Sequence, residues 1–384
     1  MNETRTTRRA EPRKGPGEAR GSFHLKGDSK GVTHPAPYGA RLAVLAAALA
    51  VAAQPAAPPR YAVEVKDTRR VAAVLTYHVV CPELKAKEWF VFAAAAPELP
   101  GQTKVKTTLS PNGTAAKERG APGRGLAVAR VPATSAELKT TLPIRVAYEA
   151  QLRSRTLVEL PAGAAAPKVE PLSAAERKQY LAENGEINFA HDAFQKWLRD
   201  EGLVRDREDD IAFARAAFLR VRNTMKYEFV ENMDRQASAV CVSRRSDCGG
   251  LAVVFAAALR ANGIPARTLY GRWARSADAD AKLGGAAYYQ WHVKAEFYAA
   301  GVGWVPADPG AAVEDRGRVP SATRHFGADA GDFLTFHVDG GLGVDAGPFG
   351  AQTVGNLQTP AWWASGGGRA PPTRATEGWT VEAK

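Results

Sequence analysis

The stretch Ser246-Asp247-Cys248-Gly249-Gly250-Leu251 opens a long apolar run and decides the fold of this chain. Apolar side chains recur in the run at the spacing of one helix face, at Leu251, Val254, Phe255, Ala258 and Leu259. Such a stripe is typical of a helix that is buried along one side. Ser246 or Asp247 can cap its start, and Asn262-Gly263 supplies a stop signal. The sequence therefore predicts a buried helix with Cys248 in its first turn.

A thiol at this position is favoured as a nucleophile. The unpaired N–H groups of a first helical turn, together with the positive end of the helix dipole, stabilise a thiolate. The same groups, among them the backbone N–H of Cys248, can hold the oxyanion that forms on a substrate carbonyl. Gly249 and Gly250 leave space beside the sulfur for that carbonyl. The competing interpretation is a buried structural cysteine, and the Asp-Cys-Gly-Gly motif alone does not decide between them.

A histidine and an aspartate follow on two stretches with strand character. Residues 290–297, Gln-Trp-His-Val-Lys-Ala-Glu-Phe, alternate in polarity and place His292 opposite to an apolar face. A turn at Gly301-Val302-Gly303 leads back to Asp308, so His292 and Asp308 are expected on adjacent antiparallel strands. A lone strand histidine is more often structural, and an aspartate before proline more often belongs to a turn. Together with Cys248, however, they fit a nucleophile, a base and an orienting carboxylate.

The region from Ile211 to Gly310 resembles the transglutaminase-like superfamily. The resemblance rests on three blocks taken together, Asp247-Cys248-Gly249-Gly250, His292-Val293-Lys294-Ala295-Glu296-Phe297 and Gly303-Trp304-Val305-Pro306-Ala307-Asp308-Pro309. It implies an α+β, papain-like fold, in which a central helix packs on an antiparallel sheet. It also implies that Cys248 is the nucleophile, His292 its base and Asp308 the group that orients the histidine.

One catalytic component of that family lacks an evident counterpart. Related enzymes use an upstream Gln or Trp side chain as a second oxyanion donor, and no Trp lies between Trp197 and Cys248. Tyr227 is a candidate for this role, with Gln236 as the alternative. The sequence contains no acidic cluster suited to Ca²⁺ and no paired Cys/His spacing suited to zinc. Neither a metal nor another cofactor is therefore expected.

Residues 61–160 differ from the catalytic region. Short apolar runs with alternating polarity, such as Tyr61 to Val65 and Ile144 to Tyr148, are separated by loops rich in turn residues. This pattern predicts a β-sandwich-like domain. No residue in it is an evident catalytic group.

A catalytic domain is predicted over residues 171–345, after a Pro/Ala-rich linker. Its first helix is expected to begin at Ser173, because Glu176 follows three residues later as in a capping box. Residues 346–384 are predicted to be a loop-rich tail. In this tail we expect Trp362-Trp363 to pack on the catalytic domain and the residues beyond Gly366 to be flexible.

The first 60 residues carry another pattern. Residues 1–40 are polar, basic and rich in Gly and Pro, which predicts a disordered leader. Residues 41–60 contain the apolar run Leu42 to Ala53, the cleavage motif Ala50-Val51-Ala52 and a Pro/Ala linker. The run fits a secretory signal, cleaved or retained as an anchor, and an Ala-rich linker is the competing interpretation. We therefore expect export to the periplasm, envelope or medium, with a true start downstream of Met1 because so long a leader is unusual.

Charge and cysteine content narrow the function classes. The formal net charge is +11, but residues 1–60 hold ten Lys/Arg against four Asp/Glu, so the remainder is only weakly basic. That remainder has no dense Lys/Arg run with interleaved aromatics, which argues against a nucleic-acid partner. Cys81 and Cys241 could pair in an oxidising compartment and leave Cys248 free. Two reduced, buried thiols are slightly favoured over that pair.

These observations predict a cysteine enzyme that acts on protein or peptide amides through a thioester intermediate. Water would resolve the thioester in a peptidase or amidase, and an amine would do so in a cross-linking acyltransferase. Hydrolysis is slightly favoured, because water needs no acceptor site. The alternative is an exported binding or scaffold module that has kept its triad residues by descent. Membrane or envelope association through the N-terminal apolar segment is a further expectation.

Overall fold

The computed structural model describes residues 60–117, 124–206, 209–318, 321–369 and 374–383. The predicted leader and the signal-like segment, residues 1–40 and 41–60, lie outside these ranges except for Arg60 and remain predictions. Within the described ranges, no helix is both long and apolar enough to cross a bilayer.

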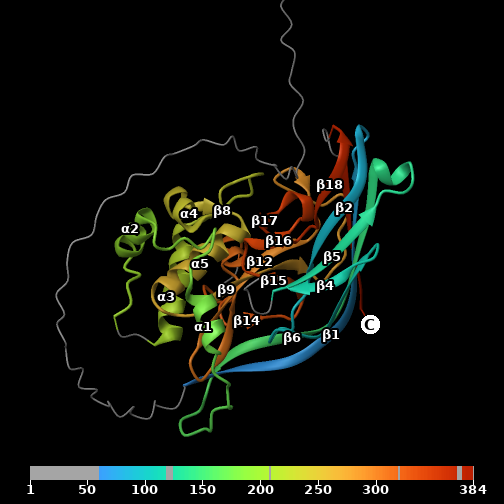
Figure 1. Cartoon of the computed structure of the whole chain (residues 1–384). Coiled ribbons are helices and arrows are strands. Elements are labelled where there is room, and N and C mark those ends of the chain that lie inside the picture. The colour runs from blue at the N-terminus through green and yellow to red at the C-terminus, as the bar shows by residue number, and fades with distance from the viewer. Residues whose placement is uncertain (1–59, 118–123, 207–208, 319–320, 370–373, 384) are drawn as a thin grey trace, which may run out of the picture. The chain divides into compact units, whose positions relative to one another are not determined.

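A four-stranded antiparallel sheet lies beside the helices of the predicted catalytic domain (Figure 1). Its strand order is β13 (Gly303–Ala307), β12 (Trp291–Ala299), β9 (Ala266–Trp273) and β15 (Phe333–Val338). The sheet is covered by helix α5 (Cys248–Ala261) and by α3 (Asp210–Thr224), which packs on both α5 and β12. A central helix on an antiparallel sheet is the arrangement that the sequence predicted, and the α+β fold class is confirmed.

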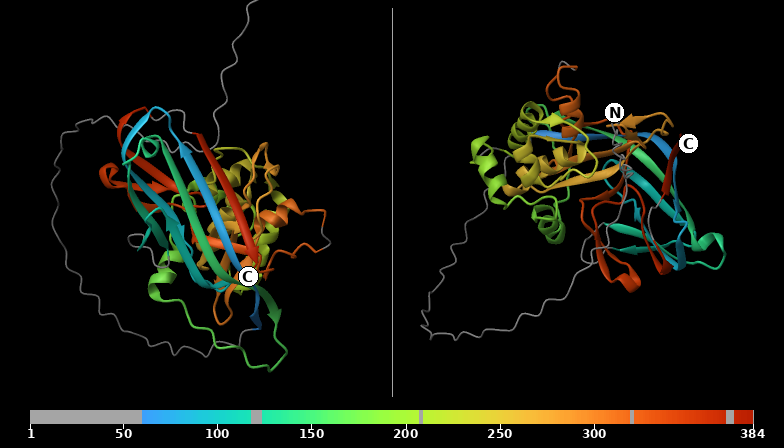
Figure 2. Two further views of the ribbon diagram at one scale, coloured as in Figure 1. Left: turned by 90° about the vertical axis from the view of Figure 1, so that its right-hand side faces the viewer. Right: turned by 90° about the horizontal axis from the view of Figure 1, so that it is seen from above.

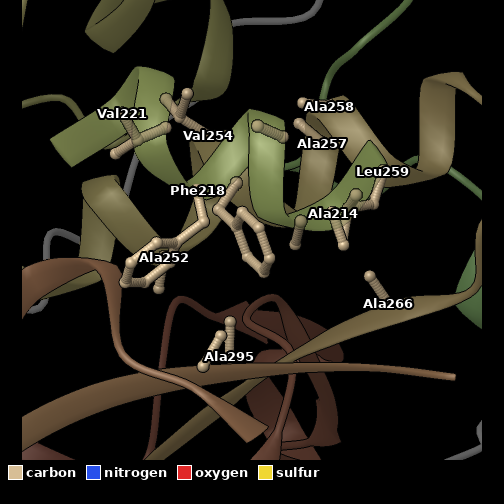
Figure 3. Packing of buried hydrophobic residues seen from close by; sticks show 14 of the residues in the cluster. Ala214, Phe218, Val221, Ala252, Val254, Ala257, Ala258, Leu259, Ala266 and Ala295 are labelled. Atoms are coloured by element: carbon tan, nitrogen blue, oxygen red, sulfur yellow. The ribbon is translucent and has the colours of Figure 1, made fainter. Parts of the chain in front are cut away.

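The α5 helix is buried, as the sequence predicted, and burial extends beyond the one apolar face that the spacing indicated. Every side chain from Leu251 to Leu259 is 0% exposed. Phe255 meets Phe218 of α3 edge-on, with ring centroids 6.2 Å apart. Side chains of α3, α5, β9 and β12 meet in one cluster, in which alanines let the backbones approach closely (Figure 3). Dense packing of this kind fixes the position of the helix start, where Cys248 lies.

Two antiparallel sheets form the sandwich-like part of the chain. One has the order β14 (Ala328–Asp329), β6 (Thr141–Glu159), β1 (Tyr61–Val80) and β19 (Arg374–Ala383), with β3 (Gln102–Ser110) also paired to β6. The other has the order β18 (Ala361–Gly368), β2 (Leu84–Ala95), β5 (Gly125–Pro132) and β4 (Thr114–Lys117). Figure 2 shows β1 running between β6 and β19. Residues of both sheets share a second hydrophobic core, which contains Trp89, Val146 and Trp379.

The prediction of a loop-rich tail over residues 346–384 is wrong for three segments. The strand β17 (Ala351–Val354) pairs with β16 (Leu342–Asp345), and β18 and β19 each add a strand to a larger sheet. The run Gly366-Gly367-Gly368, predicted to be flexible, pairs with β2. A Cβ added at Gly366 would lie 2.2 Å from the backbone oxygen of Lys85, and one at Gly368 would lie 2.2 Å from that of Glu83. The glycines therefore allow two backbones to approach closely rather than supplying flexibility.

The paired tryptophans also differ from their predicted place. Trp362 packs edge-on against Trp89, with ring centroids 5.4 Å apart, and Trp363 packs edge-on against Phe92 at 5.6 Å. Both partners belong to β2. The tryptophans thus pack within the sandwich and not on the catalytic domain.

Several short elements complete the fold. They are η1 (Glu137–Lys139), α1 (Ala174–Leu181), α2 (Asp192–Asp200), β7 (Lys226–Tyr227), α4 (Ala237–Ser243), β8 (Arg245–Ser246), β10 (Lys282–Leu283), β11 (Ala286–Ala287), α6 (Pro309–Glu314), β16 (Leu342–Asp345), η2 (Gly347–Phe349) and β17 (Ala351–Val354). The predicted capping box of α1 is present, since the Ser173 hydroxyl accepts from the Glu176 N–H and the Glu176 carboxylate accepts from the Ser173 N–H.

Cys81 and Cys241 lie in different hydrophobic clusters. Cys81 belongs to the core of the sandwich and Cys241 to the core of the catalytic domain. No disulfide joins them. The sequence left open a disulfide or two reduced, buried thiols, and the structure contains the two buried thiols.

A buried ion cluster joins the long strand β6 to the catalytic sheet. The Glu296 carboxylate of β12 accepts from Arg155 of β6 at 2.5 Å and from Arg267 of β9 at 2.7 Å. The Glu296 and Arg155 side chains are 1% and 2% exposed. Burial raises the pKa of Glu296, but the charges of Arg267 and Arg155 outweigh burial, and the net effect is a lowered pKa. Glu296 is therefore ionised and holds two arginines that water does not reach.

Glu296→Ala should lower the free energy of unfolding by about 3–5 kcal/mol, because it leaves two guanidinium groups buried without their main counter-ion. Urea unfolding followed by far-UV circular dichroism measures the change. Asp200→Ala, which breaks the solvent-exposed pair with Lys196, is the matched control and should leave the midpoint nearly unchanged. Similar midpoints for the two variants would contradict the assignment of Glu296 as a structural centre.

Candidate active site

Cys248 is the first residue of α5, as the sequence predicted. The Asp247 carboxylate caps the helix by accepting from the N–H groups of Gly249 and Gly250. Arg235 holds that carboxylate in turn, with its Nε 3.0 Å from each oxygen and its Nη2 2.5 Å from Oδ2. Cys248 is 9% exposed, so its sulfur lies at the base of an opening rather than on the surface. The cap and its arginine fix the backbone that carries the thiol.

His292 and Asp308 are brought together from the strand β12 and the end of β13. The Nε2 of His292 lies 2.7 Å from Oδ2 of Asp308, and both side chains are buried. The other oxygen of Asp308 accepts from the Ala311 N–H at 2.9 Å, because Asp308 is also the N-cap of α6. One carboxylate therefore orients the imidazole and starts a helix. The Nδ1 atom is the ring nitrogen left for the thiol.

The third pairing links the thiol to the imidazole. The thiol of Cys248 lies close enough to His292 to influence the pKa of the imidazole. Burial lowers the pKa of His292, but the charges of Asp308 and Cys248 outweigh burial and raise that pKa to about 10. Burial raises the pKa of Asp308, but His292 and Lys294 outweigh it and lower that pKa to about 2. At neutral pH the site therefore favours a protonated imidazole that faces the ionised Asp308 carboxylate.

Aromatic rings fix the plane of the imidazole. Trp273 of β9 stacks on His292 with centroids 4.5 Å apart and an angle of 23°, and Phe333 of β15 meets it edge-on at 6.0 Å. The ammonium of Lys294 lies 4.6 Å from the Trp273 centroid and 3.6 Å from Asp329. The sequence analysis did not identify Trp273 or Phe333 as part of the site. Their contacts with His292 depend on the order of strands in the sheet, which sequence spacing does not give.

Two glycines after the nucleophile have packing roles that the sequence analysis did not predict. A Cβ added at Gly249 would lie 3.1 Å from Cδ of Arg235, and one at Gly250 would lie 2.1 Å from the Ser246 hydroxyl. Gly249 also lines the cavity beside Cys248. Space for a substrate, which was the predicted reason for both glycines, therefore applies to Gly249 alone.

Gly310 is a further site residue that the sequence analysis did not identify. A Cβ added to it would lie 2.9 Å from both Cα and Cβ of Cys248 and 3.5 Å from Oδ1 of Asp308. The first turn of α6 thus packs directly behind the nucleophile. A glycine here allows the start of α6 and the start of α5 to touch.

Gly310→Ala should lower the rate of alkylation of Cys248 by iodoacetamide, and any peptide turnover, by about ten-fold or more. The added methyl group must push the thiol out of line, and a shift of about 1 Å can lower a catalytic rate about 10²-fold. Gly185→Ala is the control, since a Cβ there meets nothing within 4 Å. A folded Gly310→Ala protein with an unchanged alkylation rate would show that this contact does not position the thiol.

The structure distinguishes between the two side chains that the sequence offered as oxyanion donors, Tyr227 and Gln236. Tyr227 lies near Cys248, since it pairs with Ser246 of β8 and Cys248 contributes to the shifted pKa of its hydroxyl. Burial is the main cause that raises the pKa of the Tyr227 hydroxyl, which keeps the hydroxyl protonated as a donor. Gln236 is instead the N-cap of α4, and its side chain accepts from Asn188.

Backbone donors are limited by the helix cap. The N–H groups of Gly249 and Gly250 point to Asp247, and the N–H of Leu251 donates to the Asp247 backbone oxygen. Of the four N–H groups in the first turn, that of Cys248 is left for a substrate oxygen. Tyr227 and this N–H therefore stay the predicted pair of oxyanion donors.

A cavity of about 240 Å³ opens beside Cys248. Its walls combine apolar groups, such as Phe229, Leu283 and Trp291, with the polar groups Glu186, Arg235 and Gln358. The hairpin of β10 and β11 forms part of the apolar wall, because Gly284 at its tip packs against Phe229. A peptide segment can therefore reach the sulfur along a partly apolar recess.

A buried helix that presents a cysteine to a histidine and an aspartate on an adjoining antiparallel sheet defines the class of transglutaminase-like proteins. Residues 199–309 match the family model of the transglutaminase-like superfamily. The resemblance predicted from the three sequence blocks is therefore confirmed for this part of the chain.

One solved structure, that of the Cytophaga protein given below, is similar to this chain at the level of fold. An uncharacterized protein of Haemophilus influenzae is 29% identical over 135 residues, which cover 29% of this chain and 37% of that relative. The match thus spans little more than a third of the relative's length. A candidate cysteine protease from Cytophaga hutchinsonii has a similar structure, with a TM-score of 0.51 and 12% identity over 84% of this chain and 92% of that one. The periplasmic domain of TgpA from Pseudomonas aeruginosa, at 14% identity over 66% of this chain and 92% of that one, has a TM-score of only 0.34.

Proposed function

We propose that the protein is a cysteine-dependent enzyme that breaks amide bonds of proteins or peptides through a thioester on Cys248. One observation carries the proposal. The thiol of Cys248 lies close enough to His292 to influence the pKa of the imidazole, and His292 Nε2 lies 2.7 Å from the Asp308 carboxylate. A nucleophile, a base and an orienting group within bonding reach of one another are the parts that acyl transfer needs.

The proposed reaction begins from the thiolate of Cys248, whose proton resides on His292. The thiolate attacks the carbonyl carbon, and the resulting oxyanion is held by the Cys248 N–H and the Tyr227 hydroxyl. The C–N bond then breaks, the protonated His292 gives its proton to the leaving amine, and a thioester remains. Water, deprotonated by His292, attacks the thioester and releases a carboxylic acid and the thiol. An amine in place of water would instead form a new amide.

We favour hydrolysis slightly over transfer to an amine, because water needs no acceptor site. A catalytically idle binding or scaffold module is the competing proposal. The fold alone supports either one. The cavity that reaches Cys248 favours the enzyme, since an idle domain has no need of access to its thiol.

One experiment separates these possibilities. The purified protein is incubated with a mixed peptide pool and a labelled primary amine, and the products are identified by mass spectrometry. New peptide termini or deamidated glutamines indicate hydrolysis, and incorporation of the labelled amine indicates transfer. A scaffold module leaves the pool unchanged and reacts slowly with iodoacetamide at Cys248.

We also propose that the protein is exported, with the signal-like segment at residues 41–60 as the export element. The proposal rests on the apolar run Leu42 to Ala53 and the motif Ala50-Val51-Ala52. Fractionation of cells followed by N-terminal sequencing tests it. A protein found in the cytosol with residues 41–60 intact would contradict it.

A further inference from the structure

The cavity beside Cys248 has one wall whose charge is not balanced. Of the described residues that line it, three carry a charge, which are Glu186, Arg235 and Asp247. Arg235 is already committed to Asp247, because three N–H···O contacts of 2.5 to 3.0 Å join the two side chains. Glu186 has no arginine or lysine of its own in the wall. When Glu186 is ionised, the wall beside Cys248 therefore carries one negative charge in excess.

Glu186 is held rigidly in that wall. Its backbone N–H donates to the side chain of Asn184, and its backbone oxygen accepts from the Ala237 N–H at the start of α4. The carboxylate accepts a short hydrogen bond from the Tyr270 hydroxyl. A Cβ at Gly340 would lie 2.3 Å from Oε2 of Glu186, so the missing side chain of Gly340 makes room for the carboxylate. The acid is thus fixed in place, and none of the described residues that line the cavity forms an ion pair with it.

We infer that this cavity binds a primary ammonium group of the substrate, with the Glu186 carboxylate as its counter-ion. The apolar groups Phe229, Leu283 and Trp291 on the cavity wall suit the methylene stem of a lysine-like side chain. Binding beside Cys248 would place a cationic substrate next to the reacting bond. As a statement about turnover, this inference rests on the proposed function.

The electrostatics of Glu186 agree with a missing cation. Burial is the main cause that raises the pKa of Glu186, and the hydrogen bond from Tyr270 and the charge of Arg235 offset burial only in part. The nearby acids Asp339 and Asp247 raise this pKa further. Asp339 is itself paired with Arg260 at 2.7 Å. An ammonium in the cavity would supply the positive charge that favours the ionised carboxylate.

The binding test uses the Cys248→Ala protein, which cannot turn over a ligand. Nα-acetyl-lysine amide and Nα-acetyl-norleucine amide are titrated separately and followed by isothermal titration calorimetry and NMR. The lysine compound should bind at least about ten-fold more tightly than the norleucine compound, because only its ammonium can pair with Glu186. Equal affinities, or no detectable binding of the lysine compound at millimolar concentration, would overturn the inference.

Two variants in the same background assign the effect to one residue. Glu186→Gln keeps an oxygen for the Tyr270 hydroxyl but removes the charge, and it should abolish the preference for lysine over norleucine. Glu228→Gln removes a carboxylate just outside the cavity, where Glu228 pairs with Arg245 on the exposed side, and should leave the preference unchanged. If Glu186→Gln does not fold, the lysine-to-norleucine comparison in the parent protein still decides. A preference that survives in folded Glu186→Gln contradicts the assignment.

Kinetic measurements on the wild-type protein then identify the source of the ammonium. A peptide that the protein cleaves is chosen from the mixed pool and compared with a variant in which norleucine replaces lysine. In a separate reaction, a free amine is tested as a competitor of water for the thioester. A loss of kcat/KM with the norleucine peptide assigns the cavity to the acyl-donor substrate, whereas incorporation of the amine that depends on Glu186 assigns it to an acceptor. If no peptide is turned over, the proposed function fails, while the binding titrations still test the cavity.

Discussion

Cys248→Ser is expected to lower turnover of any peptide substrate by about 10⁴-fold or more while the protein remains folded. A serine hydroxyl cannot form the anion that His292 and the start of α5 stabilise in a thiol, and the loss of a nucleophile removes nearly all of a triad's contribution. The substituted oxygen is smaller than sulfur, so the surrounding core needs little adjustment. Turnover is measured with a peptide identified from the pool, and folding by thermal unfolding.

Cys241→Ser is the matched control for this prediction. Cys241 is also a buried thiol of the catalytic domain, and its sulfur lies 3.2 Å from the Ser238 backbone oxygen, which a serine hydroxyl can also reach. Burial raises the pKa of Cys241 to about 11, so it should stay a thiol and react slowly with iodoacetamide. Wild-type turnover in Cys248→Ser, or an equal loss in Cys241→Ser, would remove Cys248 from its proposed role.

The core of the site could be predicted from sequence because its signals are local. Asp247 caps α5 immediately before Cys248, and stop residues follow the apolar run within one helix length. His292 and Asp308 are separated by one hairpin, so the strand pattern alone places them on neighbouring strands. Each inference needed only short spacings and the periodicity of one element.

The supporting residues could not be predicted, because each depends on a contact between segments that are distant in sequence. Gly310 touches Cys248 only because α6 returns to the start of α5. Trp273 reaches His292 because β9 and β12 are adjacent in the sheet. Strand order and helix packing arise from the whole core, and periodicity within one element carries no information on them.

The C-terminal strands were missed for a different reason. Glycine-rich segments such as Gly366-Gly367-Gly368 have the composition of flexible linkers, because glycine loses more conformational freedom on folding than other residues. In β18 the same glycines relieve contacts with the backbone of β2. Composition alone therefore cannot separate a flexible run from one whose backbone packs closely. The partner strand decides between them.

Asp308→Asn is expected to lower kcat/KM by about 10²- to 10⁴-fold. The amide keeps an oxygen for the Ala311 N–H, so the start of α6 should persist, but it no longer supplies the charge that stabilises a protonated His292. In the Ser-His-Asp triad of a serine protease, the same aspartate-to-asparagine change lowers kcat about 10⁴-fold. Asp315→Asn is the control. The Asp315 carboxylate lies 2.9 Å from His325 Nε2, so the two form a similar carboxylate–histidine pair that does not include His292.

The pH profile makes this prediction specific to charge. Because the folded pKa of His292 is raised from 6.5 to about 10, its contribution to stability is complete below pH 6.5 and is lost as the pH rises through about 10. Asp308 has the opposite pH dependence, because its folded pKa is lowered from 3.8 to about 2. Its contribution to stability is complete above pH 3.8 and is lost as the pH falls toward about 2. The alkaline limb of kcat/KM should therefore lie near pH 10 in the wild type and shift toward neutral pH in Asp308→Asn. A loss of rate with an unmoved alkaline limb would mean that Asp308 orients His292 without setting its charge.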